Sequence, residues 1–310
     1  MNIRNSVIKK GFIISLVLVF LLPVIGCQSS SSTEIKKTIV VTYPVLGAVV
    51  KDLVGNQATV IVPMPNGADP HDWQPSAKDV ETINNADLVV QNGLGLEAGM
   101  AKTLATAQDR GVKFFTAADH ITIRYVGPGE GIPSGDPDQA IGAPDPHLWM
   151  DPLGMVSVVN SLSAELVRDF GLTVSARAAD LEKRLDDLNS NVMNILGVIP
   201  PSERKLVTGH ESMGYFADRY NFKIVGVIVP SLSTQAEVSA ADLVNLKTAI
   251  QENQVKAVFT ELGTSASVAE TVGRETGAQI VELSTHVLPP DGSYITFMQN
   301  VAQVITDALK

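Results

Sequence analysis

Two series of short, strand-like runs lie on either side of one long amphipathic segment, and this order limits the fold more than any other feature of the sequence. The runs are rich in β-branched residues and cover 38–43, 58–62, 88–91 and 113–115, then 205–208, 223–229, 255–260 and 279–283. Strands that alternate with helices are typical of parallel, doubly wound sheets. The sequence therefore predicts an α/β fold with two lobes, each with a mainly parallel, four-stranded sheet.

Helix-like patterns fill most of the intervals between these runs. They cover 46–53, 76–85, 97–110, 152–170, 211–220, 236–253 and 265–276. Ser76, with Asp79 three residues later, is typical of a capped helix start. Residues 127–144 are rich in Gly, Pro and Asp and lack periodicity, which predicts a mobile loop.

The most regular helical pattern runs from Ser175 to Leu196, where apolar residues recur at intervals of three and four. Ser175 can cap its start, and Gly197 followed by two prolines ends it. A helix of that length spans roughly 33 Å. We interpret 174–200 as a helix that joins lobes at 38–173 and 201–310, with the ligand in the cleft between them. A coiled-coil partner is the alternative, but no second segment of this kind accompanies it.

The N-terminus has the pattern of a bacterial lipoprotein signal. Residues 1–26 contain three basic side chains, no acidic one and the apolar run Phe12–Leu22, which is short for a transmembrane helix. Cleavage before Cys27 would leave a lipidated cysteine, and residues 27–37 then form a flexible tether. Cys27 is the only cysteine, so the chain can form no internal disulfide and has no thiolate for a metal site in the mature domain.

The overall charge restricts the class of partner. The chain carries a net charge of −10 at pH 7, and the basic N-terminal segment makes the remainder more acidic still. A surface of that sign argues against binding of nucleic acid and suits a cationic ligand.

The pattern Asp-Pro-His-x-Trp occurs twice, at Asp69–Trp73 and at Asp145–Trp149, and contains both tryptophans of the chain. Proline fixes its own φ and biases the preceding residue toward extended geometry. Each copy therefore holds an imidazole on a stiff loop with an aromatic side chain two residues later. This arrangement indicates that His71 and His147 bind a ligand.

Two further histidines lie two and three residues after predicted strands. His210 comes after the run 205–208 and His286 after the run 279–283, and ligands of open α/β sheets gather at the carboxyl ends of strands. His120 has neither feature. Four neutral imidazoles satisfy a tetrahedral zinc ion, and their wide separation along the chain excludes a zinc finger.

Two glutamates could support these ligands. Glu211 could orient or replace a ligand, although a solvated acid at a helix N-terminus is the favoured interpretation. Glu261 follows the run 255–260 and could orient a histidine by hydrogen bonding.

Other functional classes find less support. A zinc hydrolase would need an open coordination position and a general base, and Gly214 stands where a second histidine would complete His-Glu-x-x-His after His210. An adhesin would be expected to show repeats or a low-complexity stalk. A binder of organic solutes would be expected to show clustered aromatic residues, and only 5% of the residues are aromatic.

Across essentially the whole mature chain, the sequence resembles the zinc- and manganese-binding lipoproteins that deliver metal to bacterial ABC importers. The resemblance rests on Asp69-Pro70-His71 with Pro75-Ser76, Asn92–Glu97, Asp145–Pro152, Thr208-Gly209-His210 with Gly214-Tyr215-Phe216, Val258–Glu261 and Glu275–Ala278. It implies that His71, His147 and His210 occupy the first three ligand positions, the third of which is His or Glu in the family.

The fourth ligand position usually carries Asp, and here the matching run Leu283–His286 places a histidine there. An all-nitrogen set favours Zn²⁺ over Mn²⁺ or Fe²⁺, which remain the alternatives. The chain also lacks the long histidine-rich loop of many zinc-binding members, since 127–144 contains no histidine.

The resemblance further implies a mechanism. It describes a monomeric, extracytoplasmic protein, lipid-anchored to the cell membrane, that captures a metal ion and passes it to an ABC permease served by an ATPase subunit. It is a binding protein and not an enzyme, and its long helix restrains lobe opening. Because histidine must be neutral to coordinate, metal affinity should fall below about pH 6.

Overall fold

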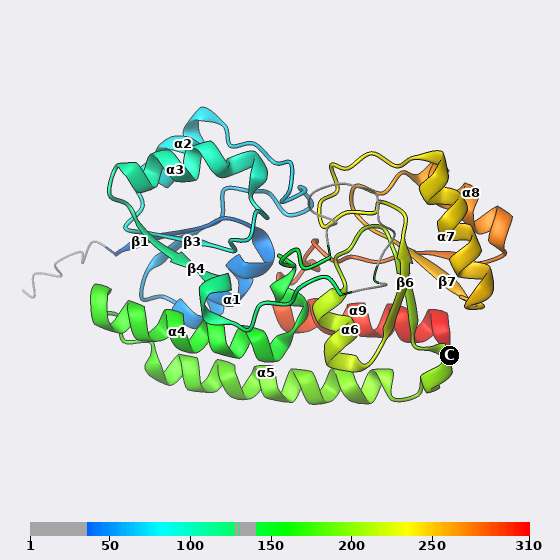
Figure 1. The fold of residues 1–310 in the computed structure, drawn as a ribbon. Helices are drawn as coiled ribbons and strands as arrows, with labels where there is room; N and C mark the ends of the chain where they lie inside the picture. The colour runs from blue at the N-terminus through cyan, green and yellow to red at the C-terminus, as the bar shows by residue number, and fades with distance from the viewer. Residues whose placement is uncertain (1–35, 128–129, 131–140) are drawn as a thin grey trace, which may run out of the picture. The chain divides into compact units, whose positions relative to one another are not determined.

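The computed structural model describes residues 36–127, 130 and 141–310, and Figure 1 shows their arrangement. The predicted signal segment 1–26, Cys27, most of the tether and most of the loop 127–144 lie outside the described residues. Among the residues that are described, no helix combines the length and apolar character needed to cross a membrane.

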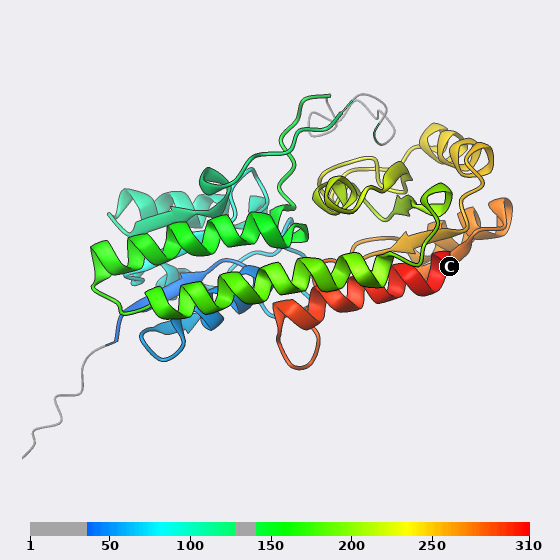
Figure 2. The same cartoon turned by 90° about the horizontal axis from the view of Figure 1, so that it is seen from below.

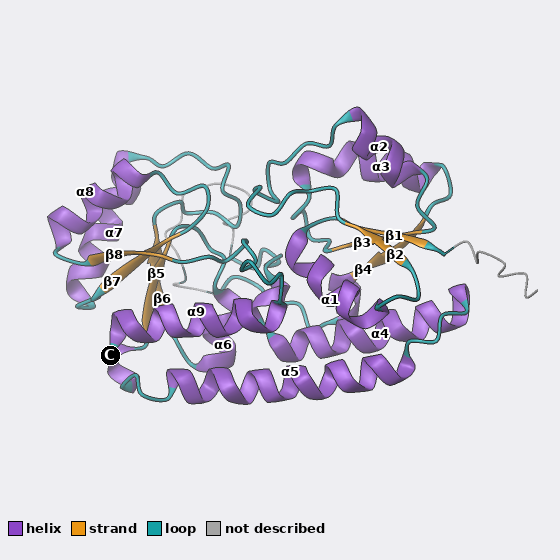
Figure 3. Ribbon diagram, turned by 180° about the vertical axis from the view of Figure 1, so that it is seen from behind, coloured by secondary structure: helices purple, strands orange, loops and turns teal. Residues whose placement is uncertain are grey.

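The first lobe contains a four-stranded, fully parallel sheet in the order β2-β1-β3-β4. Its strands are β1 (Thr38–Val41), β2 (Thr59–Ile61), β3 (Leu88–Gln91) and β4 (Lys113–Thr116). Helices α2 (Ala77–Asn84) and α3 (Ala101–Asp109) cover one face, and α1 (Pro44–Val54) and α4 (Pro152–Phe170) cover the other, as Figure 3 shows. With both faces covered, the central strands β1 and β3 are mostly apolar, and Ile39–Val41 and Leu88–Val90 are fully buried, as expected for a parallel sheet.

The second lobe contains four parallel-paired strands that form two hydrogen-bonded pairs and not one continuous sheet. Strand β5 (Lys205–Thr208) pairs with β6 (Lys223–Val227), and β7 (Ala257–Thr260) pairs with β8 (Gln279–Glu282). Strands β5 and β7 lie next to each other. Just beyond their carboxyl ends a side chain joins them, because the Gly209 N–H donates to a carboxylate oxygen of Glu261 at 3.0 Å.

Helices of the second lobe begin later than their sequence patterns suggest. They are α6 (Gly214–Tyr220), α7 (Ala240–Glu252) and α8 (Ala266–Thr276). Helix α7 starts where Ser239 and Asp242 form a reciprocal capping box, and the predicted box of Ser76 and Asp79 is present at α2. Helix α6 starts at Gly214 because residues 210–213 form the loop that carries His210.

Helix α5 (Ser175–Leu196) has the bounds that the sequence predicts and lies along both lobes (Figures 1 and 2). Its buried stripe includes Leu185, Leu188 and Val192. The predicted cap is wrong: Val174 occupies the N-cap position, and no side chain accepts a hydrogen bond there. Ser175 already lies within the first helical turn, where its hydroxyl cannot serve the N–H groups that follow an N-cap.

A C-terminal helix, α9 (Tyr294–Leu309), is absent from the helices predicted above and packs against α5 (Figure 2). Its start is capped by the Ser293 hydroxyl, which accepts from Thr296 N–H at 3.2 Å. It buries Phe297, Val301 and Ile305, which are spaced by four residues. Helix α5 therefore packs against α4 of the first lobe and against α9.

Candidate metal centre

The structure brings His71, His147, His210 and His286 together. One ring nitrogen of each lies within 4.8 Å of the corresponding nitrogen of every other, and all four residues are buried. His71 follows β2, His210 follows β5 and His286 follows β8, whereas His147 directly precedes the short 3-10 helix η4 (Leu148–Met150). Each lobe contributes one pair.

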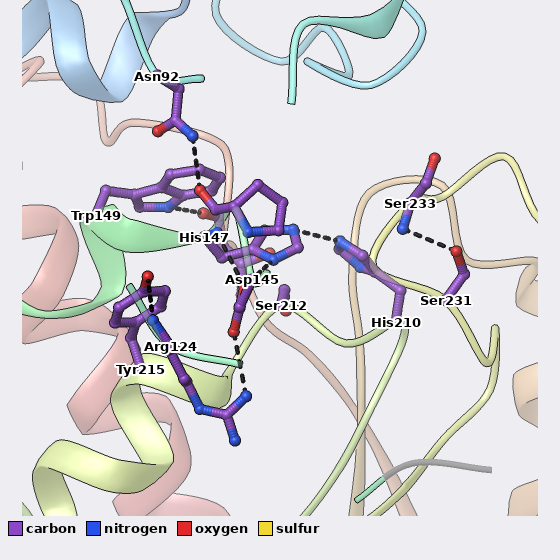
Figure 4. Close-up of polar contacts among 12 residues, drawn as sticks. Asn92, Arg124, Asp145, His147, Trp149, His210, Ser212, Tyr215, Ser231 and Ser233 are labelled. Carbon is purple, nitrogen blue, oxygen red and sulfur yellow. Dashed lines mark hydrogen bonds and ion pairs between the residues drawn. The ribbon is translucent and has the colours of Figure 1, made fainter. Parts of the chain in front are cut away.

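The spacing of the ring nitrogens suits a tetrahedral ion. Nε2 of His147 lies 3.3 Å from Nε2 of His71 and 3.2 Å from Nε2 of His210, and Figure 4 shows the second of these contacts. Ligands at the usual zinc–nitrogen distance around a tetrahedral centre lie roughly 3.3–3.4 Å apart. The buried Nε2 of His286 has no hydrogen-bond partner among the described residues, so this donor also remains available for a cation.

The repeated motif has a local structural explanation. In each copy the aspartate side chain accepts a hydrogen bond from the backbone N–H of the histidine two residues later, at 2.9 Å for Asp69 with His71 and for Asp145 with His147. Asp145 also contacts Nδ1 of the His147 ring at 2.9 Å. Since an ionised carboxylate only accepts, Nδ1 of His147 carries the proton and Nε2 presents its lone pair to the centre.

The two tryptophans of the motif differ in their roles. Trp149 is fully buried, and its ring centroid lies 5.3 Å from those of both His147 and His286. Its indole N–H donates to the carbonyl of Thr285 at 2.9 Å, which ties the two histidine-bearing segments together. Trp73 is only partly buried and packs on the core. Of the two motif tryptophans, Trp149 is therefore the one that lies beside the histidine rings.

Glu261 supports the two histidines of the second lobe. Its carboxylate lies 3.4 Å from Nδ1 of His210 and accepts from the hydroxyl of Thr285 at 2.5 Å. Because that hydroxyl donates its only proton to Glu261, it accepts from Nδ1 of His286, 2.8 Å away. Ser212 adds a further donor at 2.6 Å. Nε2 of both histidines is thus left as the donor atom that can face a metal.

Electrostatics keep His71, His147 and His286 in the neutral form that coordinates. Burial lowers the pKa of His71 and His286 well below the ordinary histidine value, and the neighbouring histidines add to the effect. Burial also lowers the pKa of His147, although the Asp145 carboxylate opposes the shift. For Glu261, burial by itself would raise the pKa, but His210 and the hydroxyl donors lower it. Neutral imidazoles backed by carboxylates are groups that could hold a divalent cation.

The remaining candidates, His120 and Glu211, are not members of this group of four. The ring of His120 stacks on Phe115 with centroids 4.4 Å apart, as its lack of a motif suggests. Glu211 is only 6% exposed and precedes α6, so its interpretation as a solvated acid at the helix start is wrong. Sequence reasoning did not single out Thr285 or the carboxylate of Asp145 as supports. Asp145 lies inside the repeated motif, which was the available signal.

A cavity of about 330 Å³ leads to one histidine of the group. His71 lines this cavity, and the lining also includes Gly95, Pro146, Ser233 and residues 141–144. An ion that reaches the centre through this cavity therefore meets His71.

Comparisons with known proteins agree with the geometry. A sequence profile described as zinc-uptake complex component A, periplasmic, matches residues 39–308. The zinc-binding lipoprotein AdcA of Streptococcus pneumoniae is 28% identical over 86% of this chain, and the manganese-binding lipoprotein MntA of Halalkalibacterium halodurans is 25% identical over 87%. The chain spans 52% of the length of AdcA and 88% of that of MntA.

The same fold occurs in a solved structure, the periplasmic zinc binding protein TroA from Treponema pallidum. The TM-score is 0.72 at 26% identity, with 88% of this chain and 99% of that chain covered. The predicted fold of two α/β lobes joined by a long helix is thereby confirmed, and so is the resemblance drawn from the motifs. The chain belongs to the zinc-uptake component A family of periplasmic proteins.

Proposed function

We propose that this protein captures a divalent transition metal ion, first of all Zn²⁺, and delivers it to the permease of an ABC importer. The observation that carries the proposal is the convergence of four buried imidazoles, three of which have Nδ1 next to an acceptor and Nε2 directed to a common centre. His71, His147, His210 and His286 would each supply one ligand atom.

The donor set favours zinc over the alternatives. Zn²⁺ binds readily to imidazole nitrogen in tetrahedral sites, whereas Mn²⁺ prefers carboxylate and carbonyl oxygen. The carboxylates of Asp145 and Glu261 lie behind the histidines and are occupied by hydrogen bonds to them and to nearby donors. Mn²⁺ and Fe²⁺ would bind the same four nitrogens more weakly.

The chain acts as a binding protein and not as an enzyme. A catalytic zinc site keeps one position open for water and places a general base beside it. Here four protein ligands would close the coordination shell. Glu261, whose carboxylate lies 3.4 Å from Nδ1 of His210, is hydrogen-bonded to the Gly209 N–H and to two hydroxyls and is not available as a base.

Delivery follows from the architecture. Lobes at 38–173 and 201–310 hold two histidines each, and the connecting segment 174–200 contains α5, which lies along both. Parting the lobes would separate the histidine pairs and release the ion to the permease, which an ATPase subunit serves. Lipid on Cys27 would hold the monomer at the outer face of the cell membrane.

Titration of the metal-stripped protein with Zn²⁺ in competition with a chromophoric chelator tests the proposal, with Mn²⁺ as the competing ion. His286→Ala should weaken zinc binding by more than about 100-fold, because losing a ligand costs more than losing a residue that orients one. His120→Ala is the matched control, since that ring stacks on Phe115 away from the centre.

Two outcomes would contradict the proposal. Preference for Mn²⁺ over Zn²⁺ in the wild-type protein would overturn the choice of metal. Equal affinities of the His286→Ala and His120→Ala variants would remove His286 from the ligand set.

A further inference from the structure

Arg124 is a nearly buried cation that contacts three carboxylates, one of which, Asp145, contacts the ring of His147. Its side chain is 8% exposed, and its nitrogens lie 2.5 Å from Glu130, 2.9 Å from Asp218 and 3.5 Å from Asp145. Burial of the guanidinium would lower the pKa of Arg124, but the three carboxylates raise it. Figure 4 shows Arg124 on the far side of Asp145 from His147.

Asp145 divides its two oxygens between these neighbours. Oδ1 accepts from both the backbone N–H and Nδ1 of His147, whereas Oδ2 faces Nη1 of Arg124. A carboxylate held from both sides cannot rotate about its terminal torsion. The direction of the hydrogen bond to the His147 ring is therefore determined by the position of Arg124 as well as by the motif itself.

Arg124 is in turn held by helix α6 of the second lobe. Its backbone N–H donates to the hydroxyl of Tyr215 at 3.0 Å, and its Nε donates to Asp218 at 2.9 Å. Gly214, the first residue of α6, lies so close that a Cβ there would overlap with both Asp145 and Arg124. Helix α6 of the second lobe therefore lies in direct contact with Arg124 and Asp145, the pair behind His147.

The first copy of the motif shows the same division of contacts. Asp69 uses Oδ1 for the backbone N–H of His71, and its Oδ2 accepts from the hydroxyl of Thr234 in the second lobe. In both copies one oxygen serves the histidine and the other is held by a group that belongs to, or is bonded to, the opposite lobe.

We propose that Arg124 is a positioning residue that orients His147 through Asp145 and makes this orientation depend on the contact with α6. The metal-binding consequence rests on the function proposed above, whereas the orientation itself does not. When the lobes part, Arg124 loses Tyr215 and Asp218, and the support behind His147 loosens together with the ligand pairs.

The test compares Arg124→Gln with Arg219→Gln. Arg219 on α6 forms the other ion pair between α6 and the first lobe, with Asp151 at 2.6 and 2.8 Å, and does not contact Asp145. The first readout is the Nδ1–H resonance of His147 in the metal-free protein, and the second is zinc affinity. Arg124→Gln should shift the resonance and weaken zinc binding about tenfold, the lower end of the range for groups behind a ligand. Arg219→Gln should change neither.

A double mutant with Asp145 shows whether Arg124 acts by positioning His147 or by stabilising the protein in general. In an Asp145→Asn background, Arg124→Gln should cause little further loss of zinc affinity, because the link to His147 is already broken. If Arg124→Gln fails to fold, Asp218→Asn replaces it, since that side chain is 64% exposed and tolerates change. Asp218→Asn should shift the same resonance.

The proposal would be overturned if Arg124→Gln and Arg219→Gln changed the resonance and the zinc affinity equally. It would also be overturned if Arg124→Gln weakened zinc binding as much in the Asp145→Asn background as in the wild-type protein. An unchanged His147 resonance in Asp218→Asn would overturn it as well. Absence of zinc binding by the wild-type protein would refute the proposed function instead. The metal-free resonance would still report on the role of Arg124.

Discussion

Glu261→Gln is the substitution that most directly tests how the centre is built. The change is nearly isosteric and removes a buried charge that contacts the Gly209 N–H, Ser212, Thr285 and His210. The amide oxygen can replace one carboxylate oxygen. Its NH₂ group, however, then faces hydroxyl and imidazole donors where the carboxylate accepted from them. His210 then loses the carboxylate beside its Nδ1, and the Thr285 hydroxyl that accepts from His286 loses the partner that orients it.

The size of the effect follows from these contacts. A residue that orients a metal ligand is worth about 10–100-fold in affinity, and Glu261 supports two ligands. The contact with His210 is long at 3.4 Å, and the contact with His286 passes through Thr285. We therefore take the lower value, a tenfold loss of zinc affinity, for each of the two histidines. The expected total loss is about 100-fold in zinc affinity, or about 2.7 kcal/mol of binding free energy.

The assay is the competitive zinc titration, with Glu97→Gln as the matched control. Glu97 is also buried and accepts from a hydroxyl and a backbone N–H, those of Thr42 and Asn92, but contacts no histidine ring. Its replacement should lower stability and leave zinc affinity within about threefold, since no ligand depends on it directly. A Glu261→Gln variant that keeps wild-type affinity, or loses no more than Glu97→Gln, would refute the reasoning.

Two further predictions concern pH and stability. Because folding lowers the pKa of His71, His147 and His286, the unfolded chain binds more protons near pH 6, so urea unfolding should show the metal-free protein losing stability as the pH falls below about 6.5. Because these pKa values are lowered, zinc affinity should be lost at a lower pH than the pKa of free histidine would give. A zinc affinity that already declines between pH 7.5 and 7 would contradict this. Leu188→Ala in the buried stripe of α5 should cost about 2–5 kcal/mol of unfolding free energy. The exposed Met193→Ala on the same helix should cost less than about 0.5 kcal/mol, and equal losses would exclude the packing explanation.

The strength of sequence reasoning lay in local patterns. The bounds of α5 and α4 follow from apolar spacing and from the Gly and Pro residues that end helices, and both agree with the structure. The spacing of Phe297, Val301 and Ile305 after Ser293 was an equally readable signal for α9, so its omission reflects a pattern overlooked and not one absent. The late start of α6 was not readable, because the loop that carries His210 displaces the helix.

The sequence by itself determined that two rigid loops would each present a histidine, because the hydrogen bond from the histidine backbone N–H to the aspartate side chain spans only two residues and forms in both copies of the motif. It also placed His210 and His286 at strand ends, where parallel topology collects ligands. Only the tertiary structure decided which groups support them. Glu261 meets Gly209 across 52 positions, and Trp149 meets Thr285 across 136. The first contact depends on how β5 and β7 pack within the second lobe, and the second on how the two lobes pack. Side-chain packing over these separations leaves no periodic trace in the chain.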